Sequence, residues 1–228
     1  MGYKFDFSFL PQFFGVFVDG AKMTLIISLI SVFVGTLLGA LLYFLRESNF
    51  GIGKFKPLKI ISTVYIEIIR GTPIILQIYL VYIGSALFFG LNIEVLEAAI
   101  IAISLNSSAY VAEIIRSGVE AVDKGQMEAA RSLGMNKGQA MRLVILPQAV
   151  KNILPAVGNE FVAVIKESSI ASVIGVGELM FKSKIVTGAT YLQLEPLIVI
   201  AGFYFVMTFS LGRLMGYLER RMKASDMR

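Results

Sequence analysis

The sequence predicts an all-α membrane protein: a single domain, residues 1–228, with five transmembrane helices and a polar loop on the cytoplasmic side. Two observations lead to this prediction. The chain is 56% hydrophobic and only 16% charged, with a mean hydropathy of +0.75, whereas soluble domains are about 25% charged. Apolar stretches of about 20 residues, the length that crosses a bilayer, recur along the chain. A long charged segment, about residues 117–147, separates two of them.

Five segments are apolar and long enough to be spans, and they lie at about residues 20–45, 58–88, 93–116, 148–172 and 193–218. The second is longer than a bilayer requires. Gly71 and Pro73 are expected to kink or divide it, because proline removes a helical hydrogen bond.

Two spans carry glycines four residues apart. Gly35 and Gly39 lie in the first span, and Gly212 and Gly216 lie in the fifth. This spacing lets helices approach closely in a bilayer. The pattern is common by chance, so the sequence leaves open which pair makes a contact.

The charged segment, about residues 117–147, predicts two short helices joined by a turn. Asp123 can cap the first helix, with Gln126 as its capping-box partner. Asn136 can cap the second helix, and Gln139 occupies the matching position.

Two further residues shape this loop. Gly134 suits the left-handed position after the first helix, and Pro147 is expected to interrupt or bend the second. A rigid pair of helices on a loop predicts a docking surface for a partner. The alternative is an amphipathic hairpin that lies on the lipid headgroups.

The basic residues predict the orientation, since lysine and arginine collect on the cytoplasmic side. Fifteen of the 21 basic residues fall in the first loop, the long loop and the C-terminal tail. They are Arg46, Lys54, Lys56, Lys59, Arg116, Lys124, Arg131, Lys137, Arg142, Lys151, Arg213, Arg220, Arg221, Lys223 and Arg228. The N-terminus is therefore expected outside and the C-terminus in the cytoplasm. The net charge of +5 comes with basic residues concentrated on one side of a membrane, and this placement argues against nucleic-acid binding.

Several charges lie within the spans, where each costs about 2.5–3.5 kcal/mol. Glu67 and Arg70 are three residues apart on one helical face and could neutralise each other. Glu160 lies near mid-depth of the fourth span, beside Asn159.

Polar residues in neighbouring spans predict a water-filled pocket for a charged or zwitterionic solute. Asn106, Ser107 and Tyr110 form a polar patch in the third span. A helix break at Thr72 and Pro73 would expose backbone groups to such a ligand. The alternative is that the buried charges hold helices together and never contact a solute.

Residues needed for several other functions are missing. The chain has no histidine and no cysteine, which removes the usual nucleophile–base pairs and the commonest metal ligands. It also lacks the glycine-rich loop that binds ATP phosphates. We therefore expect no catalytic residues, no metal site and no cofactor on this chain.

The long loop contains a spaced motif formed by Glu128, Ala129, Ala130, Gly134, Val144, Leu146 and Pro147. This motif resembles the coupling loop of ABC importer permeases. The family usually has isoleucine where this chain has Val144. Two other stretches resemble the polar amino acid uptake branch, the arginine/histidine/glutamine type: residues 65–73, which include Arg-Gly-Thr-Pro, and residues 158–169, which begin Gly-Asn-Glu.

The resemblance implies a permease subunit in a bacterial inner membrane that imports polar amino acids by alternating access. Cationic amino acids would be favoured by Glu67 and Glu160, although Arg70 partly offsets them. A cytoplasmic ATPase dimer would bind ATP and magnesium and dock on Glu128, Ala129, Ala130, Arg131, Gly134, Leu146 and Pro147. A second permease chain and an extracytoplasmic solute-binding protein would complete the importer.

The polar residues of the spans themselves are the predicted substrate-binding residues: Glu67, Arg70, Thr72, Pro73, Asn106, Ser107, Tyr110, Asn159 and Glu160. The resemblance favours a structural or gating role for Glu67 and Arg70, because such residues occur throughout the family whatever the substrate. From the residues alone, an ion-coupled secondary amino acid carrier is the alternative. Five spans without an evident repeat and without histidine make that alternative weaker.

Overall fold

The structure is a computed structural model that describes residues 3–48, 50–51 and 55–224. The fold is all-α, as predicted. The helices are α1 (Leu10–Glu47), α2 (Pro57–Gly71), α3 (Ile74–Phe89), α4 (Val95–Glu120), α5 (Lys124–Ser132), α6 (Lys137–Ala140), the π-helical turn η1 (Met141–Ile145), α7 (Leu146–Glu167), the 3₁₀ helix η2 (Ser168–Ile174), α8 (Leu179–Thr190) and α9 (Glu195–Ala224). Lys54 and Arg228, which contributed to the predicted orientation, lie outside the described residues.

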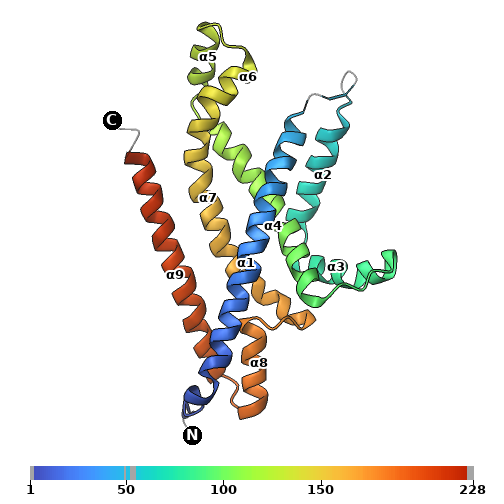
Figure 1. Ribbon diagram of the computed structural model, residues 1–228, viewed down its shortest axis with the longest axis vertical. Helices are drawn as coiled ribbons and strands as arrows, with labels where there is room; N and C mark the ends of the chain where they lie inside the picture. The colour runs from blue at the N-terminus through green and yellow to red at the C-terminus, as the bar shows by residue number, and fades with distance from the viewer. Residues whose placement is uncertain (1–2, 49, 52–54, 225–228) are drawn as a thin grey trace.

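The long helices run roughly side by side along the molecule (Figure 1). The short helices α5 and α6 lie at one end, whereas α8 and the N-terminus lie at the other (Figure 1). Within the described part of the chain, four helical stretches are long and apolar enough to cross a membrane: Leu10–Glu47, Val95–Glu120, Lys137–Ile174 and Glu195–Met222. The pair α2 and α3 brings the number to five if it counts as one span.

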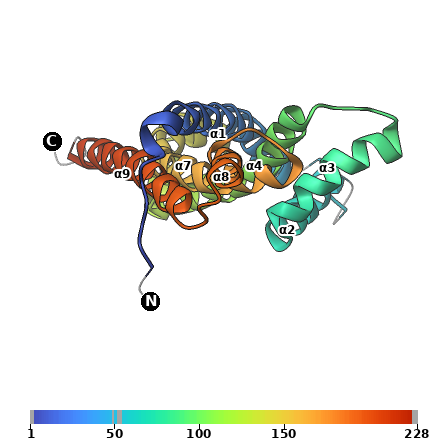
Figure 2. The same ribbon diagram turned by 90° about the horizontal axis from the view of Figure 1, so that it is seen from below.

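The predicted second span is an elbow. The chain bends by 111° from α2 to α3, and the break falls at Thr72 and Pro73, where the sequence predicted it. Pro73 cannot continue the α2 hydrogen-bond ladder and instead caps α3 with an extended backbone. Because of this bend, α3 projects sideways from the body of the molecule (Figure 2).

Close packing of α1 against α4 forms the centre of the fold. A Cβ atom added at Gly35 would lie 2.9 Å from the Ser107 Cβ, and one added at Gly39 would lie 2.8 Å from the Val111 Cβ. This first glycine pair is therefore a true helix contact. An added Cβ at Gly212 meets nothing within 4 Å, so the glycine pair in α9 makes no such contact within the described chain.

We expect Gly39→Leu to lower the yield of folded protein strongly, because the new side chain would force α1 away from α4. Gly15→Leu in the same helix is the matched control, since nothing lies within 4 Å of a Cβ at Gly15. The measurement is the monodisperse fraction after detergent extraction. Equal yields from the two variants would contradict the proposed importance of this contact.

The chain continues through Pro147 without the predicted interruption. The π-helical turn η1 precedes α7, and the Leu146 N–H donates to the Met141 carbonyl oxygen five residues back. Pro147 follows in the first turn of α7, where its missing N–H is tolerated. The prediction that this proline interrupts the helix was wrong, and the loop helix and the fourth span form one stretch, Lys137–Ile174.

Helix α8 was not predicted. It takes part in polar contacts at the end of the molecule where the N-terminus lies (Figure 1). Buried Glu178 caps α8 by accepting hydrogen bonds from the Met180 and Phe181 N–H groups at 2.9 and 2.7 Å. Burial raises the pKa of Glu178, and these hydrogen bonds oppose the shift. The Tyr204 hydroxyl of α9 also donates to Glu178, at 3.0 Å, so the cap ties α8 to α9.

The start of the chain is tied to α9 in a similar way. Fully buried Glu195 accepts hydrogen bonds from the Tyr3 hydroxyl at 2.8 Å and from the Asp6 N–H at 3.2 Å. The hydrogen bond to Glu195 raises the pKa of the Tyr3 phenol. These contacts fasten the N-terminal segment to the first residue of the last helix.

Candidate docking loop and polar membrane sites

The end of α5 is closed by Gly134. Its φ of +88° lies in the left-handed region, as predicted. The Met135 N–H donates to the Ala130 carbonyl at 3.2 Å and the Gly134 N–H donates to the Arg131 carbonyl at 3.0 Å. This pair of hydrogen bonds is a Schellman motif, and it fixes the turn between α5 and α6.

The helix caps of the loop match the predictions in part. Asn136 and Gln139 form the predicted capping box. Asp123 caps α5 by accepting from the Gly125 N–H at 2.6 Å. Gln126 does not complete a capping box there, because its Oε1 accepts a hydrogen bond from Gln148 of α7 at 3.3 Å. That part of the prediction was wrong, and Gln126 instead links α5 to α7.

The loop is held rigidly on the spans by an apolar cluster. Val122, Ile145 and Ala149 are buried there, and Met127 of α5 packs against them. Ala130 is also buried, at 4% exposure. The loop helices therefore have a core of their own and do not lie as a hairpin with one apolar face open.

The outer surface of the loop offers side chains for a partner. Glu128, Ala129 and Arg131 are exposed, and so is Pro147, whereas Leu146 is half-buried. Leu133 is 82% exposed and Leu143 is 62% exposed. We did not predict these two leucines, although large apolar residues in a polar segment are a signal for a contact surface.

In the membrane part, Ser107 and Glu160 come together. The Ser107 hydroxyl donates to Glu160 Oε1 at 2.9 Å, which joins α4 to α7. Asn159 faces another way and lines an open cavity of about 380 Å³ between α4, α7 and α9. These neighbours in the sequence therefore face different surroundings.

Thr72 lies in the elbow, and Asn106 of α4 is linked to the elbow through Gln77 of α3. The Gln77 Nε2 donates to the carbonyl oxygens of Ile69 and Thr72 at 2.8 and 3.1 Å and to the Thr72 hydroxyl at 2.9 Å. Asn106 Nδ2 of α4 in turn donates to Gln77 Oε1 at 2.9 Å. The broken helix was expected to expose backbone groups to a ligand, but these two carbonyls already have a donor. Gln77 was not among the predicted residues.

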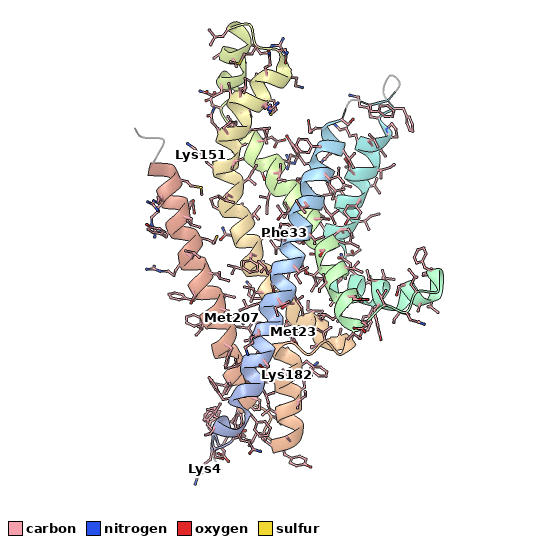
Figure 3. All side chains as sticks on the ribbon, viewed as in Figure 1. Lys4, Met23, Phe33, Lys151, Lys182 and Met207 are labelled. Carbon is pink, nitrogen blue, oxygen red and sulfur yellow. The ribbon has the colours of Figure 1, made fainter. Side chains whose placement is uncertain are left out.

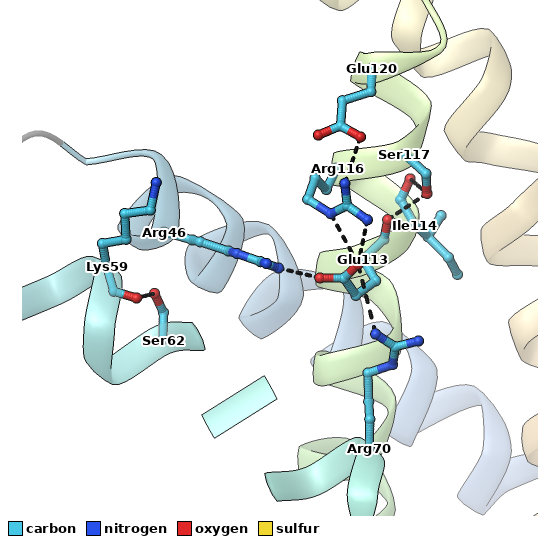
Figure 4. Close-up of polar contacts among 9 residues, drawn as sticks. All are labelled: Arg46, Lys59, Ser62, Arg70, Glu113, Ile114, Arg116, Ser117 and Glu120. Carbon is cyan, nitrogen blue, oxygen red and sulfur yellow. Dashed lines mark hydrogen bonds and ion pairs between the residues drawn. The ribbon is translucent and has the colours of Figure 1, made fainter. Parts of the chain in front are cut away.

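An ion-pair cluster gathers around Glu113 of α4 (Figure 4). Its carboxylate pairs with Arg46 of α1, with Arg116 at 2.8 Å and with Arg70 of α2 at 3.7 Å. The Arg70 guanidinium also lies 5.5 Å from the centre of the Tyr110 ring, a cation–π distance. One carboxylate thus joins three helices.

Glu67 stands apart from all these groups. It is exposed on α2 and makes no hydrogen bond or ion pair among the described residues. Arg70 pairs with Glu113 instead, so the prediction that Glu67 and Arg70 neutralise each other was wrong. Glu113 was not predicted as a site residue, although it is a carboxylate within the predicted span at about residues 93–116.

The comparisons with known proteins agree with this architecture. Residues 35–224 match the family described as "Binding-protein-dependent transport system inner membrane component". The chain is 41% identical to the arginine transport system permease protein ArtQ of Bacillus subtilis, over 97% of this chain and 99% of that protein. It is 37% identical to the glutamine transport system permease protein GlnP of Escherichia coli K12, over 96% and 99%.

Two solved structures of ABC transporters resemble this chain. A crystal structure of an amino acid ABC transporter with histidines superposes with a TM-score of 0.91 at 46% identity, and covers 96% of this chain and 100% of that chain. The MetNI methionine ABC transporter shares the fold, with a TM-score of 0.74 at 20% identity over 92% of this chain and 98% of that chain. With its loop of two short helices and its long apolar helices, the chain belongs to the family of binding-protein-dependent transport system inner membrane components.

Proposed function

We propose that this chain is the membrane subunit of an ATP-driven importer for polar amino acids. The observation that carries the proposal is the rigid loop of α5 and α6, which a Schellman turn closes and an apolar cluster fastens to the spans. A permease subunit is not itself an enzyme, so the energy must enter through such a surface. The similarity to arginine and glutamine permeases supports amino acids as the cargo.

The partners follow from this role. A cytoplasmic ATPase dimer carries ATP and magnesium and docks on the exposed residues around Gly134. A second permease chain completes the pathway, and an extracytoplasmic protein delivers the solute. ATP closes the ATPase dimer and draws the two loops together, which turns the pathway outward. This switch requires ATP to bind the two states with different affinity.

The charge distribution supports a cytoplasmic position for the loop and the C-terminus. Lys151 lies toward the loop, whereas Lys4 and Lys182 lie at the opposite end (Figure 3). Basic residues are concentrated at the loop end, as they are on the cytoplasmic side of membrane proteins. The N-terminus is then outside.

Substrate recognition is centred on Glu160 and Ser107, which meet between α4 and α7. Glu160 Oε1 accepts from Ser107, and no donor among the described residues reaches Oε2. That oxygen is available to an ammonium or guanidinium group. Asn159 lines the cavity on the other side of α7 and provides a polar surface for the solute there.

An ion-coupled carrier receives no support from the relatives, which are binding-protein-dependent permeases. A carrier of that kind also has no use for a rigid loop with exposed Leu133 and Leu143.

ATP-driven uptake into vesicles tests the function and the role of Glu160 together. The chain is reconstituted with its ATPase and solute-binding protein, and arginine and glutamine uptake are measured. We expect Glu160→Gln to lower arginine uptake about tenfold, the loss of one charge-assisted hydrogen bond, and to lower glutamine uptake much less. Ser107→Ala is the comparison variant: it removes the donor to Glu160 and keeps the carboxylate, so we expect it to lower arginine uptake less than Glu160→Gln does.

Equal losses for both amino acids would mean that Glu160 only holds α7 against α4. No ATP-dependent uptake by the unsubstituted transporter would refute the proposed function itself.

A further inference from the structure

Another cavity, of about 320 Å³, lies between the end of α1 and the segment that leads from α6 into α7. We call it the α1–α6 cavity. The residues that form its walls include Tyr43, Phe44, Glu47, Lys137, Met141 and Leu146. Sites that hold small molecules have volumes of roughly 300–1,000 Å³, so this cavity is large enough for one. It lies at the end of the molecule that carries α5 and α6 (Figure 1), the end that the basic residues assign to the cytoplasm.

Two opposite charges line the α1–α6 cavity from two sides. Glu47 is the last residue of α1, and Lys137 is the first residue of α6. Both side chains are exposed, and neither forms an ion pair among the described residues. An ammonium group pairs well with a carboxylate, and a carboxylate pairs well with an ammonium group. The two charges together are therefore complementary to the zwitterion of a free amino acid.

Tyr43 adds a polar group to this cavity. The residue is only 8% exposed, and its hydroxyl makes no hydrogen bond among the described residues. A buried tyrosine hydroxyl usually has a hydrogen-bond partner, so this one is available to a ligand. Phe44 and Met141 supply apolar walls, and methionine adapts to side chains of different shape.

The cavity also touches the π-helical turn that joins the loop to the fourth span. Met141 is the first residue of η1, and π-helical turns inside longer helices are frequent at functional sites. The helix runs without interruption from Lys137 to Ile174. A ligand held between α1 and η1 therefore fixes the position of the loop relative to α1.

We propose that the α1–α6 cavity binds a free amino acid from the cytoplasm and that the bound amino acid slows ATP-driven import. Its ammonium group donates to Glu47, and its carboxylate accepts from Lys137 and from the Tyr43 hydroxyl. Because the ligand contacts both α1 and the loop, it binds best to one position of the loop and shifts the transporter toward that position. Import requires the loop to move, so it slows as the imported solute accumulates. The inference rests on the importer function proposed above.

Protection of a single thiol tests binding without transport, because the chain contains no cysteine. Phe44→Cys places a thiol in the wall of the cavity. Phe50→Cys is the matched control, since Phe50 is 72% exposed and lies outside that wall. The purified whole transporter is treated with a maleimide, with and without arginine, and labelling of this chain is followed by mass spectrometry. We expect arginine to slow the labelling of Phe44→Cys at least about threefold, since a bound ligand covers the wall of its site, and to leave Phe50→Cys unchanged.

The charge pairing is tested in the Phe44→Cys background. We expect Glu47→Gln to raise the arginine concentration needed for protection about tenfold, through the loss of one charge-assisted hydrogen bond. Asp19→Asn removes a carboxylate from the same helix, where Asp19 pairs with Lys22 and both side chains are 67% exposed, and it should leave protection unchanged. Unchanged protection in Glu47→Gln would refute the site.

Two analogues and one lipid test the chemistry of the ligand. Agmatine lacks the carboxylate of arginine, and N-acetylarginine lacks its free α-ammonium group, so we expect neither to protect Phe44→Cys. Protection by either analogue as strong as that by arginine would contradict recognition of a zwitterion. Phosphatidylethanolamine also joins an ammonium group to an anion. Slower labelling in vesicles that contain this lipid, with no effect of arginine, would assign the cavity to a lipid headgroup instead.

The effect on transport is measured in vesicles whose ATPase faces the medium, with the solute-binding protein and labelled arginine inside. The medium then represents the cytoplasm. We expect unlabelled arginine in the medium to slow ATP-driven transport at least about threefold, because it holds the loop in one position. Glu47→Gln should remove this slowing and leave the rate without added arginine unchanged.

The outcomes separate this inference from the proposed function. Equal slowing in Glu47→Gln and in the unsubstituted protein would place the effect of arginine in the translocation pathway and overturn the regulatory site. ATP-driven transport without protection of Phe44→Cys would also overturn it and leave the function standing. Protection of Phe44→Cys without any ATP-driven transport would support the binding site and count against the importer.

Discussion

Gly134→Asp is expected to leave the protein folded in the membrane and to remove the ATPase activity that purifies with it. A Cβ at Gly134 meets nothing within 4 Å, so the substitution causes no clash. The φ of +88° is one that aspartate adopts more readily than most residues, at a cost of roughly 1–2 kcal/mol. The main change is a new negative charge at the tip of the docking loop, beside Glu128 and the exposed Leu133.

The measurement is a mild-detergent purification from native membranes, followed by an ATPase assay of the eluate. We expect at least about a tenfold loss of activity for Gly134→Asp, since an unmatched charge disrupts a protein interface. Gly134→Asn is the matched control, because asparagine has the same shape and tolerates the same backbone without the charge. Normal ATPase activity in Gly134→Asp would count against docking at this loop. Equal loss in both variants would point to the backbone, not the charge.

Glu113→Ala is expected to destabilise the protein more than any other single carboxylate change described above. The Glu113 side chain is only 16% exposed and is shared by Arg46, Arg70 and Arg116. Removing it leaves three guanidinium groups close together without their counterion. Loss of one partner from such a pair costs about 3–5 kcal/mol, which corresponds to a fall in melting temperature of roughly 10 °C for a chain of this length.

Thermal unfolding in detergent, followed by size-exclusion chromatography, measures this effect. Glu120→Gln is the control: Glu120 contacts the same Arg116 at 2.5 Å, but its side chain is 63% exposed. Exposed ion pairs contribute less than about 1 kcal/mol, so the control should unfold near the unsubstituted protein. Similar melting temperatures for the two variants would show that the shared carboxylate does not hold the three helices together.

The sequence was sufficient for the features that depend on local chemistry. Hydropathy predicted the all-α membrane fold, and the break at Thr72 and Pro73 was predicted because proline cannot continue a helix. The left-handed Gly134 and the capping box of Asn136 and Gln139 were predicted because each is decided within a few residues.

Features that depend on contacts between helices could not be predicted in this way. Glu67 and Arg70 share a helical face, which suggested an ion pair, but Glu113 from α4 lies within reach of Arg70. Gln126 had the spacing of a capping box, yet Gln148 of α7 provides another partner for its side chain. In both cases the spacing along the helix allowed the predicted contact, but the side chain pairs with a residue from another helix.

The continuous helix through Pro147 has a different cause. A proline normally ends the hydrogen-bond ladder four residues back, but the π-helical turn lengthens that ladder by one residue just before the proline. The spacing of apolar residues contains no sign of this local rearrangement, so the sequence alone favoured an interruption.

The contacts of Glu195 with Tyr3 and Asp6 have a consequence for the order of synthesis. The partner of Tyr3 is translated 192 positions after Tyr3 itself. This end of the molecule therefore cannot close until the last helix has been made. A chain that terminates before α9 would leave the N-terminal segment without Glu195, so a protease that cuts after Lys4 would distinguish chains that contain α9 from chains that lack it.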